Sequence, residues 1–400
     1  MSKLKPSKGN VAARKARRIA LVSNSSWYTC NFRLGLLRRL RDMGAEVYVI
    51  SPHDHSSTRL IAEGFHFVQL PIAVYGTNPL REWRGILRLI SIYRKYRFDF
   101  VFHYTAKPNI YGSMAAWWCR IPSIAITTGL GLMREEGWSF SKWVVIQLYR
   151  LAGLFSRQVW FLNRDDQQFF EQLRIVPADK SFLLPSEGVD VQWYKPGHER
   201  REHKPLHFLY AGRIVWSKGM KEFYEAALHF HRKGAPCSFH LVGFIVPDHP
   251  DAVSFDLVQE WQQQGIVRFH GETDDIRPFL AEADCVLLPS FFGEGVPRIL
   301  LEAAAMAKPI ITTDSVGCRE VVEHGVNGLL CRPKDTGHLI QTIETFLELS
   351  PSERRQMGWE GRKKVLREFE EEIVIRHYLH ALTRFLGWPA KRKKHKSVRG

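Results

Sequence analysis

The chain has 400 residues, of which 45% are hydrophobic and 24% charged, a composition typical of a soluble globular protein. This length exceeds what one hydrophobic core usually supports and predicts two domains of roughly 150–200 residues each. No apolar run approaches the roughly 20 residues of a membrane span, and the basic N-terminus lacks the apolar stretch of a secretory signal.

The net charge of +16 is concentrated at the two ends of the chain. Residues 1–18 hold seven Lys or Arg, residues 391–400 hold six, and neither segment contains an acid. We therefore expect basic, disordered tails over 1–17 and 389–400 around a nearly neutral body. Such tails favour an anionic membrane surface over nucleic acid as a partner, although they are also compatible with simple solvation.

The first half of the chain alternates short apolar runs with longer helical patterns. One such pattern, residues 32–44, ends on a glycine, as helices commonly do. This alternation is typical of βαβ units and a parallel sheet. The predicted strands of this half are 18–23, 45–51, 98–104, 122–128 and 157–163.

A polar, Pro-containing stretch at 194–205 predicts a linker between a first domain at 18–193 and a second at 206–388. The second half repeats the βα alternation, with a helix expected at 221–234. The chain is thus α/β, with two tandem Rossmann-like doubly wound domains, and its ligands are expected in the cleft at the carboxyl ends of the strands. The predicted strands of the second half are 206–212, 238–243, 266–271, 284–290 and 308–314.

The loop after the first strand of the second domain reads AGRIVWSKG and places Arg213 and Lys218 at that strand's carboxyl end. Two fixed cations in such a loop suit a diphosphate. The loop matches neither the P-loop nor the dinucleotide-binding glycine pattern. Ordinary surface exposure of two basic residues is the alternative.

A second candidate stretch, FFGEGVPRILLEAAAM, places two glutamates seven residues apart. We expect Glu294 in a turn before a helix that starts near Pro297, facing the cleft. Glu302 lies inside the apolar part of that helix, and a buried carboxylate needs partners. Ribose hydroxyls of a nucleotide would supply them; a salt bridge to a neighbouring helix is the alternative.

Two features of the first domain allow two interpretations each. His103 ends a predicted buried strand, with Lys107 four residues on, so it either faces the cleft or is a satisfied core histidine. The amphipathic segment 140–157 either lies on a bilayer or packs as a core helix under the sheet.

Taken together, these segments resemble the retaining glycosyltransferases of family 4, which have the two-Rossmann B-type fold. The resemblance covers most of the chain and is closest to bacterial enzymes of capsule, O-antigen and lipid-linked glycan assembly. One departure is Ser23 to Ser26, which replaces the usual glycine-rich start after the first strand. The similar segments are 23–40, HYTAKPNIYG (103–112), TGLG (128–131), GRIVWSKG (212–219), EGVPRILLE (294–302) and 317–330.

The resemblance implies roles on the donor side of the cleft. Glu302 would bind the ribose hydroxyls of the donor nucleotide, whereas Glu294 and the amides after it would hold the hydroxyls of the donor sugar. The donor would be a nucleotide-sugar, UDP-linked, carrying a hexose or N-acetylhexosamine. The implied donor-binding residues are Gly212, Arg213, Lys218, Gly243, Glu294, Gly295, Val296, Pro297 and Glu302.

The resemblance also implies a mechanism and an acceptor. Arg213 and Lys218 would neutralise the leaving diphosphate without a metal or cofactor, and His103 would contact the transferred sugar, so the implied catalytic set is His103, Glu294, Arg213 and Lys218. The acceptor would be a polyprenyl-diphosphate-linked saccharide, with no role for nucleic acid, used by a cytoplasmic enzyme at the inner face of the inner membrane. The acceptor-side candidates are Asn24, Lys107 and Gly129.

Two other functions remain compatible with the sequence. A sugar-nucleotide epimerase on the same fold would change the donor without an acceptor. A non-enzymatic basic protein would bind nucleic acid with strong salt dependence. Both cleft carboxylates stay unexplained by the second alternative.

Overall fold

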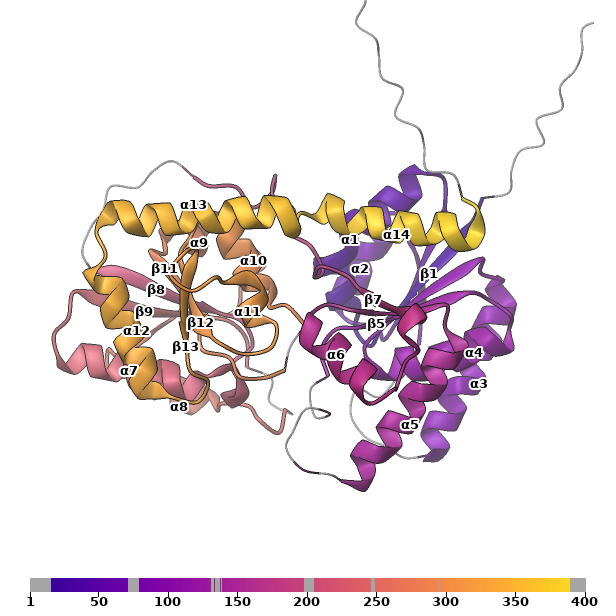
Figure 1. The fold of residues 1–400 in the computed structure, drawn as a ribbon, viewed down its shortest axis with the longest axis horizontal. Helices are drawn as coiled ribbons and strands as arrows, with labels where there is room; N and C mark the ends of the chain where they lie inside the picture. The colour runs from indigo at the N-terminus through magenta and orange to yellow at the C-terminus, as the bar shows by residue number, and fades with distance from the viewer. Residues whose placement is uncertain are drawn as a thin grey trace, which may run out of the picture.

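The computed structural model describes residues 16–70, 79–130, 133, 137, 139–197, 205–245, 249–293 and 295–388. Figure 1 shows two α/β domains side by side, each with helices on both faces of a central sheet. Residues 1–15 and 389–400 of the predicted tails and 198–204 of the predicted linker lie outside the described residues, whereas Arg17, which was assigned to the first tail, is ion-paired with Asp99 at 2.7 Å. Within the described residues, no helix combines the length and apolarity needed to cross a bilayer.

The first domain is built on a seven-stranded parallel sheet in the order β3-β2-β1-β4-β5-β6-β7. Its strands are β1 (Arg18–Val22), β2 (Glu46–Ser51), β3 (His66–Gln69), β4 (Phe100–Tyr104), β5 (Ser123–Thr127), β6 (Gln158–Phe161) and β7 (Ser181–Leu183). Its helices are α1 (Ser26–Asp42), α2 (His55–Ala62), α3 (Pro79–Tyr96), α4 (Ser113–Trp118), α5 (Phe140–Phe155) and α6 (Arg164–Gln172), with short turns at Pro108–Gly112 and Ala178–Lys180.

The second domain has a six-stranded parallel sheet in the order β10-β9-β8-β11-β12-β13. Its strands are β8 (Leu206–Ala211), β9 (Cys237–Val242), β10 (Arg268–Phe269), β11 (Cys285–Leu288), β12 (Ile310–Thr313) and β13 (Gly328–Cys331). Its helices are α7 (Met220–Arg232), α8 (Phe255–Gln263), α9 (Arg277–Glu282), α10 (Arg298–Ala305), α11 (Cys318–Val321), α12 (Thr336–Glu348) and α13 (Pro351–Glu368), with a short turn at Trp216–Lys218.

The prediction of two doubly wound domains is confirmed, and each predicted strand is present. Three strands were not predicted: β3, β7 and β13. All three form sheet edges. The helix predicted to start at residue 32 begins earlier, with Ser25 preceding its first turn.

The last helix, α14 (Glu371–Leu386), leaves the second domain and packs on the first sheet. Its Tyr378 ring lies 5.0 Å from the ring of Phe102 and 4.9 Å from that of Trp160. Figure 1 shows α13 and α14 running end to end across both domains. The second domain was predicted to extend to residue 388 and therefore included α14. The buried side chains of α14 belong instead to the hydrophobic core of the first domain.

The chain crosses between the domains twice, and the two crossings are joined. Val189 donates to the Phe369 carbonyl at 3.0 Å, and Glu371 donates to the Val189 carbonyl at 3.0 Å. Gly188 is required beside them, since a Cβ there would lie 2.9 Å from the Glu371 Cα and its φ is +79°. The two segments thus form a single hydrogen-bonded hinge.

Candidate functional site

Two glycines join the loops that follow β8 and β9. Gly212 donates its amide to the Val242 carbonyl at 3.0 Å, and Gly243 donates to Gly271 at 2.8 Å. A Cβ on Gly243 would lie 1.8 Å from the Gly212 carbonyl oxygen, so no larger residue fits there. The backbones of Gly212 and Gly243 therefore pack directly against each other, and only a Cβ on Gly212 would have room, beside the Lys218 Nζ.

Lys218 is the buried cation of this loop. It is 9% exposed and ends the short turn after Val215. A Cβ on Gly212 would be 3.8 Å from the Lys218 Nζ, so the ammonium group lies beside the glycine backbone. Arg213 is only half-buried, and its carbonyl accepts from the Tyr210 hydroxyl at 2.9 Å. Both predicted cations thus follow the end of β8.

The turn after β11 is hydrogen-bonded to this loop. The amides of Phe291 and Phe292 both donate to the Ser217 carbonyl at 3.1 Å. Helix α10 begins directly after Pro297, as predicted. Glu294 lies outside the described residues, so its predicted contact with the donor sugar stays a prediction.

The predicted role of the Gly295 amide is wrong in this structure. That amide donates to the Thr128 carbonyl at 3.2 Å, and the Gly295 carbonyl accepts from Asn163 Nδ2 at 3.2 Å. Gly129, a predicted acceptor-side residue, directly follows Thr128 and has a φ of +126°. These bonds close the second domain onto the carboxyl ends of β5 and β6, so Gly295 joins the domains instead of donating to a ligand.

Glu302 is buried in α10 and paired with a cation on its own helix. Its Oε1 accepts from Arg298 Nε at 3.1 Å, and the Tyr194 side chain also hydrogen-bonds it. Burial raises the pKa of Glu302 above that of an ordinary glutamate, whereas Arg298 opposes the shift. Glu302 therefore has protein partners, although a carboxylate accepts about four hydrogen bonds and retains capacity for ribose hydroxyls.

His103 belongs to the core of the first domain, so the prediction that it faces the cleft is wrong. Its side chain is fully buried, and its Nε2 lies 2.9 Å from the Tyr93 hydroxyl. A Cβ on Gly112 would lie 2.3 Å from the imidazole, so glycine is needed at that position. Burial lowers the pKa of His103 to about 3. The imidazole is thus neutral at ordinary pH and shielded from a substrate.

The acceptor-side candidates differ in their surroundings. Lys107 Nζ is ion-paired with Glu82 at 2.6 Å, which places it toward α3. Asn24 follows β1, and its Oδ1 is buried without a hydrogen-bond partner among the described residues. Nearby, the Trp27 ring lies 6.1 Å from that of Phe244, across the domain boundary. Asn24 is therefore the candidate with unused hydrogen-bonding capacity beside the second domain.

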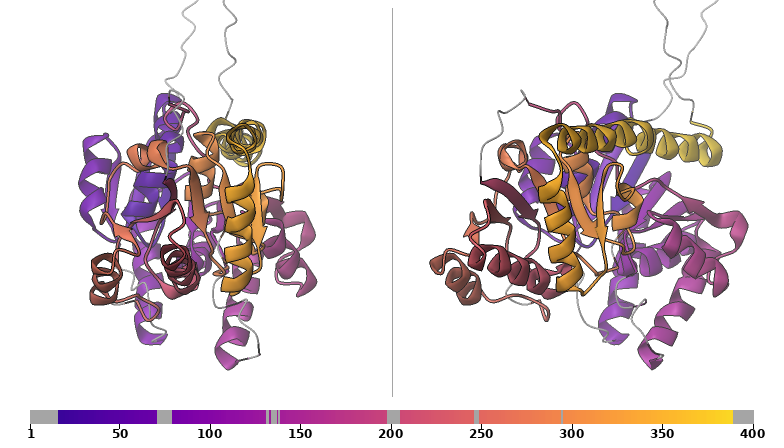
Figure 2. Two further views of the ribbon diagram at one scale, coloured as in Figure 1. Left: turned by 90° about the vertical axis from the view of Figure 1, so that its left-hand side faces the viewer. Right: turned by 60° about the vertical axis from the view of Figure 1, so that its left-hand side comes forward.

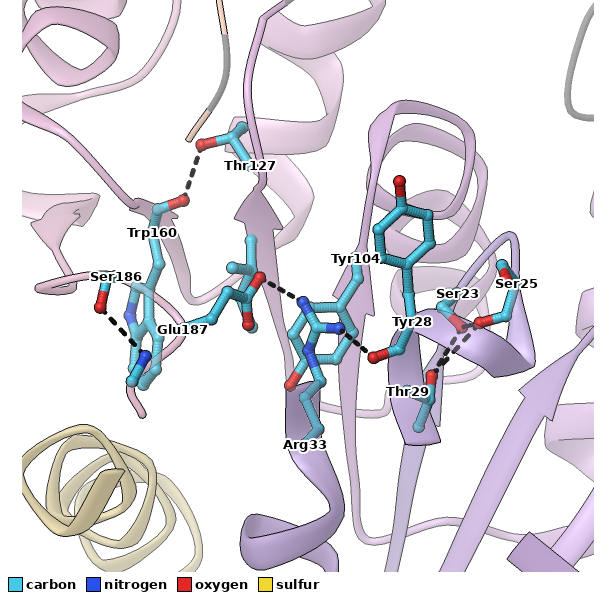
Figure 3. A network of polar contacts seen from close by, with 12 residues as sticks. Ser23, Ser25, Tyr28, Thr29, Arg33, Tyr104, Thr127, Trp160, Ser186 and Glu187 are labelled. Atoms are coloured by element: carbon cyan, nitrogen blue, oxygen red, sulfur yellow. Dashed lines mark hydrogen bonds and ion pairs between the residues drawn. The ribbon is translucent and has the colours of Figure 1, made fainter. Parts of the chain in front are cut away.

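A buried network around Arg33 of α1 was not predicted from the sequence. Figure 3 shows its guanidinium between Glu187 and the ring of Tyr104, with a bond to the Tyr28 carbonyl. The guanidinium carbon lies 3.8 Å from the Tyr104 ring centroid. Burial alone would lower the pKa of Arg33, but the Glu187 carboxylate raises it above its usual value. The pair anchors the first hinge segment to α1.

Two protein-family models match the chain over separate ranges. One, described as glycosyl transferase 4-like, matches residues 18–161, and the other, described as glycosyl transferases group 1, matches residues 205–349. Together they account for more than two thirds of the sequence.

Among curated proteins, the chain is similar to an enzyme of Campylobacter jejuni named N,N'-diacetylbacillosaminyl-diphospho-undecaprenol alpha-1,3-N-acetylgalactosaminyltransferase. The two are 28% identical over 384 residues, which cover 92% of this chain and 99% of that protein. The chain is also 22% identical to the capsular polysaccharide biosynthesis glycosyltransferase CapM of Staphylococcus aureus. That alignment covers 85% of this chain and 90% of CapM.

Among solved structures, Anabaena Alr3699/HepE in complex with UDP and glucose aligns with a TM-score of 0.76 and 20% identity, covering 92% of this chain and all of that one. A glycosyltransferase from Rickettsia africae aligns with a TM-score of 0.75 and 18% identity, covering 93% of this chain and 99% of that one. These likenesses establish the shared two-domain fold.

Proposed function

Because the chain belongs to the two-Rossmann, family-4-like glycosyltransferases, we propose that it moves a hexose or N-acetylhexosamine from a UDP-sugar to a lipid-linked saccharide. The transfer retains the anomeric configuration and needs no metal. The lipid-linked acceptor is supported by the Campylobacter relative, whose name specifies a diphospho-undecaprenol substrate. The UDP donor is supported by the HepE structure, which holds UDP and glucose.

One observation carries the donor-side proposal: the convergence of two loops at the carboxyl ends of β8 and β11. The bonds from Phe291 and Phe292 to the Ser217 carbonyl hold the cation-bearing loop against the turn before α10. Lys218 lies beside the bare backbone of Gly212 in this arrangement. A positive charge next to open glycine backbone is the combination that a diphosphate requires.

The proposed reaction depends on charge stabilisation of the leaving group. The bond between the sugar C1 and the β-phosphate oxygen breaks, and a bond from the acceptor oxygen to C1 forms on the same face. The acceptor proton passes to the departing phosphate oxygen, so no protein base is needed. Arg213 and Lys218 neutralise the charge that develops on the diphosphate, and such fixed charges contribute most to the rate when water is excluded.

Glu302 holds the nucleotide ribose in this proposal. Arg298 and Tyr194 orient its carboxylate from one side and favour its ionised form, which opposes the rise in its pKa caused by burial. The remaining lone pairs accept from the two ribose hydroxyls. Glu302 is thus a binding residue, and its loss affects donor affinity before it affects the chemical step.

The first experiment is thermal melting with UDP, GDP or ADP, on wild type, Glu302→Ala and the matched surface variant Glu368→Ala. A ligand at about 100 times its dissociation constant adds about 2.7 kcal/mol of stability. We expect a selective UDP shift that disappears only in Glu302→Ala. No shift with any nucleotide would remove the donor site and revive a non-enzymatic role.

Turnover then separates the reaction classes. With a UDP-sugar and a lipid-linked saccharide, we expect product only when both are present, and none from Arg213→Ala. Conversion of the UDP-sugar without acceptor would indicate an epimerase instead. Intact turnover by Arg213→Ala would refute its role on the diphosphate.

A further inference from the structure

Exposed apolar side chains gather on one part of the first domain. Of the fifteen exposed large hydrophobic residues in the described parts of the chain, nine lie on α3, α4 and α5. Scattered exposed hydrophobics are normal, whereas a concentration on neighbouring helices marks an interaction surface. The nine residues, called here the apolar face, are Leu80, Trp83, Leu87, Trp117, Trp118, Phe140, Trp143, Leu151 and Leu154.

The three helices pack side by side, with α4 in contact with both others. The Trp117 ring stacks on Phe155 at 4.6 Å, which joins α4 to α5. Each long helix already buries a different stripe under the sheet: Leu89 and Tyr93 on α3, and Ile146 on α5. The apolar face is therefore additional to core packing, and the fold itself does not require it.

The charged residues on α3, α4 and α5 themselves are almost all basic. The one acid among the residues of α3, α4 and α5 is Glu82, and it is neutralised by Lys107 at 2.6 Å. Arg84 and Arg88 on α3 and Arg150 on α5 are exposed and form no ion pair with the described residues. Trp side chains beside Arg are the combination that suits the boundary between lipid tails and anionic headgroups.

The apolar face also has a defined position relative to the cleft. Helix α3 leads into β4 and α5 leads into β6, so the first turns of both helices lie at the carboxyl edge of the parallel sheet. That edge carries Thr128, which bonds the second domain through Gly295. In Figures 1 and 2, α3 and α5 project from the same end of the first domain, away from α14.

We propose that the end of the apolar face formed by the first turns of α3 and α5 docks on an anionic phospholipid bilayer, inserting at the headgroup level. This inference rests on the proposed function, because it places the cleft where a lipid-linked saccharide presents its sugar. Leu80, Trp83, Phe140 and Trp143 enter the interface, while Arg84 and Arg88 contact lipid phosphates. The basic tails add attraction, but the apolar face sets the orientation.

Vesicle binding of the full chain tests the proposal directly. The tip variant Trp83→Ser/Phe140→Ser/Trp143→Ser removes three aromatic anchors, and Trp359→Ser/Leu366→Ser removes exposed apolar side chains from α13 as a matched control. Co-sedimentation uses phosphatidylcholine vesicles with and without phosphatidylglycerol. Thermal melting confirms that both variants fold, and a short water-soluble acceptor measures transfer without a membrane.

We expect wild type and the α13 control to bind phosphatidylglycerol vesicles, and the tip variant to lose at least about tenfold in affinity. The affinity of Arg84→Gln/Arg88→Gln for these vesicles should fall about thirtyfold at low salt, and by less at high salt. Transfer to the soluble acceptor should stay unchanged in all of them, so failure of the docking proposal is distinguishable from failure of the proposed reaction.

Several results would overturn the proposal. Equal vesicle binding by wild type and the tip variant would show that the apolar face does not touch lipid. Binding that disappears only when residues 1–15 and 389–400 are removed would assign attachment to the tails alone. A wild-type dimer in light scattering that the tip variant converts to monomer, without vesicle binding by either, would make the apolar face a contact between two copies.

Discussion

The buried position of His103 predicts a specific dependence of stability on pH. Its imidazole contacts Tyr93 and is closed in by Gly112, and burial lowers its pKa to about 3 from 6.5. Below about pH 6.5 the unfolded chain binds a proton here that the folded chain does not bind. The contribution of His103 to folding stability therefore falls as the pH drops from about 6.5 toward 3.

The size of this effect follows from the shift itself. Each pH unit between the two pKa values costs about 1.4 kcal/mol, so His103 alone removes about 2 kcal/mol of folding free energy by pH 5. His103→Gln keeps a polar partner for Tyr93 but has no proton to gain. We expect this variant to be less stable than wild type near pH 7 and to recover about 2 kcal/mol relative to it by pH 5.

Urea unfolding of wild type and His103→Gln at a series of pH values measures this difference. Taking the difference at each pH cancels the contributions of other histidines, such as the half-buried His240, whose pKa is also lowered by burial. A difference that stays constant between about pH 7 and 5 would refute the burial argument. So would a wild-type His103 imidazole that titrates near its ordinary pKa in an NMR experiment.

The second domain offers three more tests. Gly243→Ala forces a methyl carbon against the Gly212 carbonyl, so we expect the free energy of unfolding to fall by about 1–3 kcal/mol and UDP to cause no shift in melting temperature. Gly197→Ala, with open space around residue 197, should behave as wild type. Arg298→Ala leaves Glu302 buried without its cation, and we expect the free energy of unfolding in urea to fall by on the order of 3 kcal/mol. Adding Glu302→Gln should recover most of that loss. A lack of recovery would show that the two residues do not depend on each other. Because burial raises the pKa of Glu302, UDP affinity measured by calorimetry should fall on acidification at a higher pH than for an exposed carboxylate, and Glu302→Gln should lack that dependence.

The sequence predicted the central strands and the edge strand β10, but it missed the other three edge strands. Central strands of a parallel sheet are buried on both faces and appear as continuous apolar runs. The missed strands β3 (HFVQ) and β7 (SFL) are short edge segments with no fully buried residue. Edge strands lack half of their neighbours, so their sequences carry a weaker apolar signal.

The positions of the candidate site residues were predictable where they follow from the backbone of a strand end. They were less predictable where a side chain has several possible partners. Loop positions at strand ends correctly located Arg213 and Lys218. The four-residue spacing of Arg298 and Glu302 on one helix is typical of an ion pair, but the partners predicted for Glu302 were ribose hydroxyls or a salt bridge to a neighbouring helix. A histidine at the end of a strand can face either the core or the cleft, so the sequence alone does not determine the environment of His103. Its burial depends on contacts with Tyr93 and Gly112, which the sequence pattern does not reveal. Tyr194 gave no signal before the fold placed it beside Glu302.

The return of α14 to the first sheet affects the order in which the protein forms during synthesis. Phe102, Tyr104 and Trp160 of the first domain are covered by Tyr378, which leaves the ribosome about 220–280 residues after them. At typical translation rates of about 5–20 residues per second, this part of the first core waits about 11–55 seconds until Tyr378 can cover it. The domain that is made first is therefore completed last. Its aromatic surface is open to chaperones, or to aggregation, throughout that interval.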